Sequence, residues 1–147
     1  MKHFITILLF GNLILWSCSE EDMANSDCPE VPAGTRFFEF QHDSGELYLA
    51  WTNQNQILLA VDDQLAKPLA ERSQHINGRI LKNEWMCDIN FKWSWYFDPS
   101  DWALADASIE LCDGNPQYVE EHLEEYIGTG RYCPWSSKVY REVNDPF

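Results

Sequence analysis

The chain has 147 residues, 45% of them hydrophobic, and a formal net charge of -14 at pH 7. Its length and apolar content suit one domain with a single core. The acidity argues against binding to nucleic-acid phosphates and against electrostatic docking on anionic lipid headgroups. We therefore expect no nucleic-acid partner.

The N-terminus predicts a bacterial lipoprotein signal peptide. A basic start precedes an apolar run from Phe4 to Leu15, and Cys18 follows three residues later. The run is about a dozen residues long, whereas a membrane-spanning helix needs roughly 20. The Leu-x-Ser-Cys ending resembles the lipobox, so we expect residues 1–17 to be removed and Cys18 to carry the acyl chains, such as palmitate, that anchor the protein in a bacterial outer membrane. An ordinary signal peptide cleaved nearby is the alternative.

Residues 18–34 are polar and predict a flexible tether before a single domain, residues 35–147. The acidic run Ser19–Asp22 resembles the signal that exports some bacterial lipoproteins to the cell surface. A solvated linker is the other interpretation, in which case the domain would face the periplasm.

The domain is expected to begin with a β-hairpin followed by a helix. Arg36–Gln41 and Glu46–Thr52 are aromatic and aliphatic runs on either side of a turn-forming segment with Asp, Ser and Gly. Apolar residues at spacings of three and four then predict an amphipathic helix over Asn55–Lys67.

Three strands are expected in the middle of the chain: Gln74–Leu81, Ile89–Phe97 and Ala103–Cys112. In each segment apolar residues alternate with polar ones, which is typical of an antiparallel sheet with one covered and one solvated face. Breaks are predicted at Lys82–Glu84 and Asp98–Asp101.

A second helix is predicted from Asn115–Pro116 to about Ile127, because a capping residue is followed by proline in the first turn. Ser137–Val143 predicts a last strand. The element order indicates an α+β fold, a mostly antiparallel sheet with two helices packed on one face.

Four cysteines remain after Cys18, an even number in an exported protein, and predict two disulfides. We favour Cys112 with Cys133, which bracket the second helix, and Cys28 with Cys87. A zinc site is the rival interpretation, but no Cys-x-x-Cys pair or histidine spacing supports it. We expect no metal and no cofactor.

If the three middle strands are neighbours, their polar residues form one face that could bind a ligand. That face would hold His75, Asn77, Arg79, Lys92, Ser94, Tyr96, Asp106, Ser108 and Glu110. The binding candidates are His75, Asn77, Arg79, Tyr96 and Glu110, together with Trp135, one of several tryptophans near element ends. The alternative is a solvated face with cross-strand ion pairs such as Arg79 with Glu110. Trp93 and Trp95 are expected in the core.

Catalysis is not expected. Ser94 or Ser108 could be combined with His75 and Asp106 into a triad, but hydroxyls on regular strands lack the strained turn that presents a reactive serine. The downstream cysteines are expected to be oxidised and therefore not nucleophilic.

Several motifs in one order resemble a family of small secreted domains, the N-terminal domain of a calmodulin-binding protein, over roughly residues 36–143. They are His75-Ile76-Asn77-Gly78-Arg79-Ile80, Trp93-Ser94-Trp95-Tyr96-Phe97, Ile109-Glu110-Leu111-Cys112-Asp113-Gly114 and Cys133-Pro134-Trp135-Ser136-Ser137. Tyr96 stands where the family often has histidine. The resemblance implies a domain type. Calmodulin binding is not expected, because calmodulin targets are typically basic helices and the helix after Pro116 carries four glutamates.

These observations favour a non-enzymatic binding module on a lipid anchor, with a protein, peptide or glycan as ligand. A secreted inhibitor of a hydrolase is the alternative, and a small hydrolase is a further one. An exposed aromatic platform would favour glycan or peptide binding, whereas a protruding loop held by the Cys112–Cys133 bridge would favour inhibition.

Overall fold

The computed structural model describes residues 28–85, 87–144 and 146. The predicted signal peptide, Cys18 and the first part of the tether lie outside the described residues. Among the described residues, no helix has the length and apolar character needed to cross a membrane.

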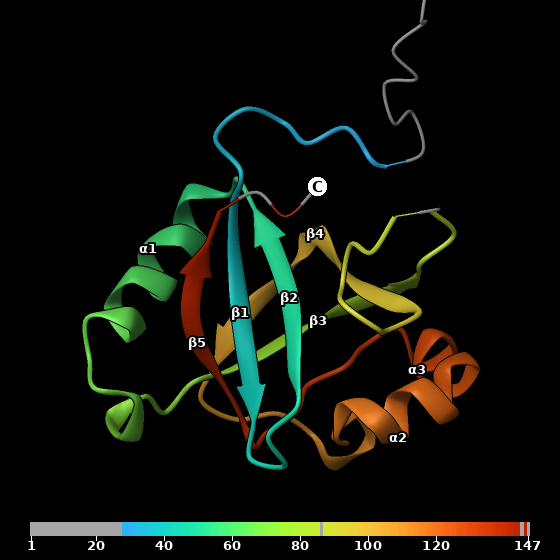
Figure 1. Ribbon diagram of the computed structural model, residues 1–147. Coiled ribbons are helices and arrows are strands. Elements are labelled where there is room, and N and C mark those ends of the chain that lie inside the picture. The colour runs from blue at the N-terminus through green and yellow to red at the C-terminus, as the bar shows by residue number, and fades with distance from the viewer. Residues whose placement is uncertain (1–27, 86, 145, 147) are drawn as a thin grey trace, which may run out of the picture.

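The first sheet is antiparallel and contains the predicted hairpin. β1 (Arg36–His42) pairs with β2 (Leu47–Thr52), and β5 (Ser137–Val143) pairs with the other edge of β1, which gives the order β2-β1-β5. The turn between β1 and β2 uses Gly45 at φ 89°, a conformation that costs glycine little. Figure 1 shows the three strands side by side.

The second sheet corrects the prediction for the middle of the chain. It has only two antiparallel strands, β3 (His75–Lys82) and β4 (Trp95–Ala105). β4 runs through the predicted break at Asp98–Asp101, and the register shifts opposite it, between Gly78 and Ile80. Pro99 is tolerated because β4 has a partner on one edge only.

Two segments predicted as strands are instead loops. Residues 89–94 leave the strand pattern because the buried Asn90 side chain accepts a hydrogen bond from Leu49 N (2.6 Å) and donates one to Trp95 O (2.7 Å). Phe91 has φ 53°, which is incompatible with a strand. Residues after Ala105 form a loop that ends in a 3₁₀ turn, η2 (Glu110–Cys112).

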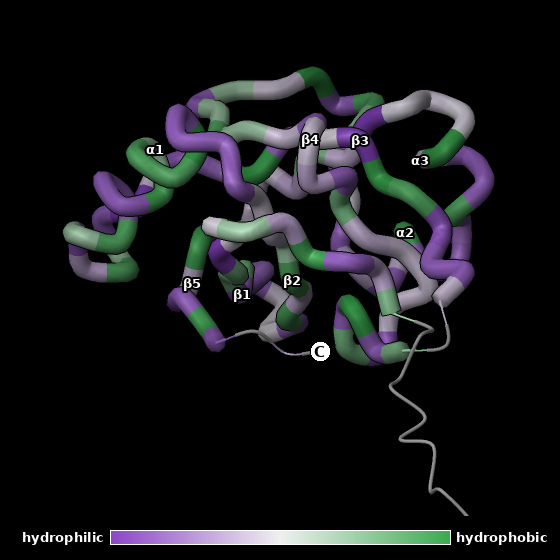
Figure 2. The backbone as a smooth tube through the Cα atoms, turned by 90° about the horizontal axis from the view of Figure 1, so that it is seen from above, coloured by the Kyte–Doolittle hydropathy of each residue, from purple (hydrophilic) through white to green (hydrophobic). Residues whose placement is uncertain are grey.

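The helices flank the sheets, the first helix at one end and the later two at the other (Figure 2). α1 (Asn55–Leu65) is the predicted first helix, and a 3₁₀ turn, η1 (Leu69–Glu71), follows it. The predicted second helix is divided at His122 into α2 (Pro116–Glu121) and α3 (Leu123–Thr129). His122 has φ -125°, and its Nδ1 lies 2.9 Å from Tyr118 O. The Asn115 side chain caps α2 as predicted, by accepting a hydrogen bond from Tyr118 N.

The core is aromatic and collects side chains from both sheets and from the helices. Its largest fully buried members are Trp95, Tyr48, Tyr132, Phe38, Phe40 and Phe97. Trp93 is also buried, so both tryptophans predicted in the core lie there. Several of these rings contact one another, with centroids 5.3–5.8 Å apart in the pairs Tyr48–Trp95, Trp95–Tyr132 and Phe97–Tyr132, which adds to the stabilisation from burial.

Both expected disulfides are present. Cys112 is joined to Cys133, with Cα atoms 5.1 Å apart, and Cys28 is joined to Cys87, with Cα atoms 5.6 Å apart. The first bridge ties the end of η2 to the segment before β5, and the second ties the start of the described chain to the loop before β4. The fold is thus a disulfide-braced α+β domain.

Candidate binding site

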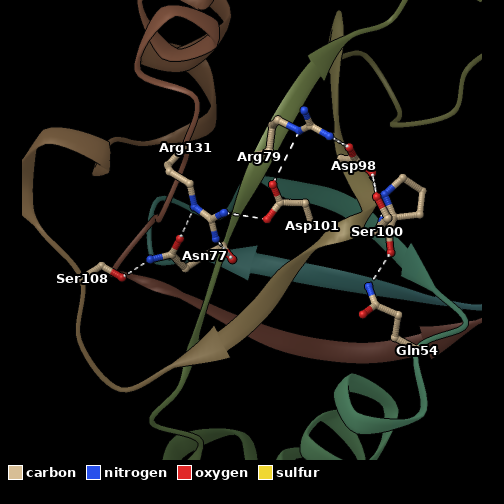
Figure 3. Close-up of polar contacts among 9 residues, drawn as sticks. Gln54, Asn77, Arg79, Asp98, Ser100, Asp101, Ser108 and Arg131 are labelled. Atoms are coloured by element: carbon tan, nitrogen blue, oxygen red, sulfur yellow. Dashed lines mark hydrogen bonds and ion pairs between the residues drawn. The ribbon is translucent and has the colours of Figure 1, made fainter.

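The outer face of β3 and β4 carries a chain of ion pairs and hydrogen bonds, which we call the β3–β4 polar network: Asn77, Arg79, Asp98, Asp101 and Arg131. The Arg131 Nη1 lies 2.6 Å from the Asp101 carboxylate, and its Nε donates to Asn77 Oδ1 at 3.0 Å. Arg79 pairs with Asp98 and reaches Asp101 at 3.6 Å. Figure 3 shows that these side chains point toward one another.

The network corrects the suggested ion pair of Arg79 with Glu110. Asp98 and Asp101, which the sequence assigned to a break between strands, are the partners of Arg79 because β4 continues through them. Glu110 lies in η2 and is exposed.

Arg131 is a member of the network that sequence reasoning missed. It enters because the segment after α3 crosses β3, where Gly78 and Tyr132 exchange two backbone hydrogen bonds of 3.0 and 2.8 Å. A Cβ at position 78 would collide with the Trp102 Cβ and approach Asp101 O to 2.9 Å, so only glycine permits the close approach of β3 to β4 at this point. An isolated glycine inside a strand pattern is the sequence signal for such an approach.

Next to the network, the buried His75 forms a hydrogen-bonded pair with Ser108, which is half-buried. The predicted wet side of His75 is covered by the loop after β4, and the residue is only 4% exposed. Its Nε2 lies 2.7 Å from Ser108 Oγ, to which the Asn77 amide also donates at 2.7 Å. Burial lowers the pKa of His75, although the negative charges of Asp113 and Asp106 act in the opposite direction. The imidazole is therefore neutral at neutral pH.

Ser108 lies in the loop after β4, whereas the sequence placed it on a regular strand. The hydroxyl is nevertheless held by two neighbours, His75 and the Asn77 amide. This geometry brings together two of the three residues of the triad considered above. The third residue, Asp106, lies nearby, but its carboxylate accepts a hydrogen bond from the Gln74 side chain, at 3.2 Å.

A hollow of about 270 Å³ opens above the His75–Ser108 pair, and we call it the Trp135 pocket. It is lined by Ser73, His75, Asp106, Ala107, Ser108 and Trp135. The Trp135 ring is 42% exposed, while its backbone N–H donates to Asp113 Oδ1 at 2.9 Å. The pocket thus combines an accessible indole wall with hydroxyl, imidazole and carboxylate groups. Two wider hollows beside the β1–β2 turn contain none of the predicted binding candidates.

The remaining predicted residues lie in other places. Tyr96 stacks on Trp51 with ring centroids 5.4 Å apart. Lys92 and Ser94 belong to the loop before β4: the Lys92 ammonium lies 4.3 Å from the centre of the Trp93 ring, and the Ser94 N–H donates to Glu120. The expected single face is therefore divided, and His75 and Trp135 are the binding candidates that meet in one pocket.

The described residues contain no group of three histidine, cysteine or acidic side chains arranged to hold a metal ion. The Trp135 pocket offers an aromatic face for stacking and several donors and acceptors for orientation. Pockets of this composition are typical ligand sites.

The fold and pocket define a small disulfide-braced α+β domain whose Trp135 pocket holds two of the predicted binding residues, His75 and Trp135. The family model described as the BP-74 N-terminal domain matches residues 34–146. The chain therefore belongs to this family, which confirms the resemblance seen in its motifs. No curated protein and no solved structure matches it.

Proposed function

We propose that this protein is a lipid-anchored module of the bacterial outer membrane that binds a polar ligand in the Trp135 pocket without converting it chemically. The observation that carries the proposal is the exposed indole of Trp135 beside a polar floor. A ring with one apolar face and hydroxyls at its edge, such as a sugar in a glycan, matches both parts: the face stacks on the indole and the hydroxyls bond to the floor.

The binding experiment uses the mature chain, residues 18–147, with Cys18→Ser so that no lipid is attached. It is applied to an array of bacterial and host glycans, and the strongest ligand is then titrated by calorimetry. Trp135→Ala should abolish the binding, because the stacking surface is removed.

Trp85→Ala is the matched control, since Trp85 is 43% exposed but lies in the loop before β4. An equal loss in both variants, or no glycan binding at all, would contradict the glycan proposal.

The anchoring part of the proposal is supported by the apolar run from Phe4 to Leu15 and by the position of Cys18. In a bacterial host, the wild-type protein should fractionate with membranes and Cys18→Ser with the soluble fraction. Membrane association that persists in Cys18→Ser would refute lipid anchoring. Digestion of intact cells with added protease then distinguishes the cell surface from the periplasm.

A small hydrolase is the second candidate, favoured by the 2.7 Å distance between His75 Nε2 and Ser108 Oγ. The Asn77 amide also donates to the same oxygen, which fixes the orientation of the hydroxyl. A fluorophosphonate probe labels reactive serines, so we expect no labelling of the wild-type chain. Labelling that disappears in Ser108→Ala would favour the hydrolase over the binding module.

A further inference from the structure

Ile109 and Leu111 are the most exposed large hydrophobic residues described, at 67% and 71%. Both lie in residues 106–113, between β4 and α2, which we call the apolar loop. Tyr118, 45% exposed at the start of α2, lines a hollow of about 290 Å³ together with Leu111. Apolar side chains gathered at one place on a surface are typical of a contact with another molecule.

The apolar loop is held in place, so the exposure of Ile109 and Leu111 does not come from a loose chain. Cys112 is buried and bonded to Cys133, and its carbonyl accepts a hydrogen bond from Cys133 N at 2.7 Å. Asp113 N donates to Glu110 O at 3.1 Å within the same turn. A rigid loop loses little conformational entropy when it binds a partner, which favours affinity.

The charge around the apolar loop is negative. The chain has no lysine or arginine between Trp93 and Gly130. The apolar loop carries Asp106, Glu110 and Asp113, and Glu125 lines the same hollow as Leu111 and Tyr118. The eight ion pairs found among the described residues involve none of these four carboxylates.

We infer that the apolar loop docks a cationic amphipathic segment of another protein or peptide. Its apolar side chains would cover Ile109 and Leu111, while its lysines or arginines would lie over the carboxylates of Glu110, Asp113 and Glu125. The charge selects the occupant, because an acidic or anionic partner would be repelled from this surface. The proposed contact uses residues 109–113 of the apolar loop together with Glu125, whereas residues 106–108 of the same loop line the Trp135 pocket.

The test uses the same mature chain with Cys18→Ser and a fluorescein-labelled 18-residue helical peptide of leucine and lysine. Anisotropy titrations should show saturable binding that weakens at higher salt, because part of the attraction is between charges. A leucine and glutamate peptide with the same apolar face should not bind. An oligolysine of equal charge should bind at least about tenfold more weakly, because it lacks the apolar contacts.

Two pairs of variants locate the contact. Ile109→Ser combined with Leu111→Ser should weaken binding by about tenfold or more, whereas Leu59→Ser, at a 62% exposed position on α1, should not change it. Glu110→Gln with Glu125→Gln should weaken binding more than Asp43→Asn with Glu71→Gln, which removes the same charge from exposed positions elsewhere. Circular dichroism checks that every variant is folded.

The inference is overturned if the Leu59→Ser control loses as much affinity as the loop variant, if oligolysine binds as tightly as the amphipathic peptide, or if no peptide binds. The first result would mean that the apolar contact is not specific to the apolar loop, and the second that the acidic chain attracts cations without an apolar contact. Glycan binding through Trp135 is measured separately, so failure of one proposal leaves the other testable.

Discussion

The β3–β4 polar network and the apolar loop lie next to each other, because the Asn77 amide of the network donates a hydrogen bond to Ser108 of the loop. The two regions differ in whether their side chains have partners within the domain. In the network, Arg79 and Arg131 are paired with carboxylates of the same domain. In the apolar loop, Ile109 and Leu111 remain uncovered while their backbone is fixed. Polar composition alone therefore does not locate a binding surface, because polar side chains can form hydrogen bonds and ion pairs with one another. Exposed apolar groups on a rigid backbone are the stronger indication.

The largest effect is expected when the disulfide that holds the apolar loop is removed. Cys112→Ser with Cys133→Ser removes a bridge of sequence separation 21, which should cost about 3 kcal/mol of unfolding free energy. Denaturant unfolding measures this loss. The double variant should also lose affinity for the leucine and lysine peptide, because the apolar loop is no longer held. Cys28→Ser with Cys87→Ser should leave that affinity intact, and a reduction there would contradict the assignment.

The next largest effect on stability is expected at Gly78 in β3, one of the two strands that carry the β3–β4 polar network. Gly78→Ala places a methyl group against Trp102 and Asp101 O, and should destabilise the domain by about 1–3 kcal/mol through overpacking. Gly128→Ala in α3 is the control, because its Cβ would meet no atom within 4 Å. The melting temperature of Gly78→Ala should be clearly lower than that of Gly128→Ala. Equal melting temperatures would refute the close approach of β4 to Gly78.

A smaller effect tests whether the network is structural. Asp101→Asn removes the carboxylate that Arg79 and Arg131 share. Because these side chains are nearly half exposed, the loss of stability should be about 1 kcal/mol or less. Asp88→Asn, an exposed acid outside the described ion pairs, provides the comparison. Peptide and glycan affinities should not change, and a large loss of either would mean that the network contacts the ligand.

The pH dependence of stability tests the burial of His75, which lies under the Trp135 pocket. Burial lowers its pKa below the ordinary value of 6.5, so the unfolded chain takes up a proton before the folded chain does. Stability should therefore fall as the pH drops below about 6.5. His75→Gln should flatten this part of the curve. The lowered pKa values of Asp98 and Asp62 act separately, and their contribution disappears only at lower pH, as the carboxylates become protonated. An unchanged slope between about pH 7 and 5 in His75→Gln would contradict the assignment.

The smallest effect concerns the exposed side chains themselves. Ile109→Ser or Leu111→Ser should change the unfolding free energy by no more than about 0.5 kcal/mol, because neither side chain is buried in the domain. Chemical denaturation measures each single variant. A loss comparable with that of a core substitution would show that these residues pack within the protein and do not await a partner.

Local patterns in the sequence predicted the elements that depend on local interactions. The β1–β2 hairpin, α1 and the capped start at Pro116 follow from turn, spacing and capping residues. The span of β4 could not be predicted, because alternation continues through Phe91, Trp93 and Trp95 whether or not the chain is a strand. What ends the strand pattern is a pair of hydrogen bonds of the Asn90 side chain, which accepts one from Leu49 N in a distant strand and donates the other to Trp95 O.

The candidate site shows the same limit. His75 and Trp135 could be named as candidates from the sequence, since one titrates and the other lies near an element end. That they share a pocket with Ser108 depends on three segments folding together. Arg131 was beyond prediction for the same reason, because it reaches Asn77 only through the crossing at Gly78.

The Cys28–Cys87 bridge also has a consequence for presentation. With Cys18 lipidated as proposed, the acyl chains and the bridge are only ten positions apart, a stretch that can span at most about 33–36 Å. In Figure 1 the described chain begins at the top of the molecule, whereas the segment between β4 and α2 crosses the bottom. Under the proposed lipidation, the bridge is the fixed point at which a short tether joins the domain, and the apolar loop would lie at the end of the domain away from the membrane.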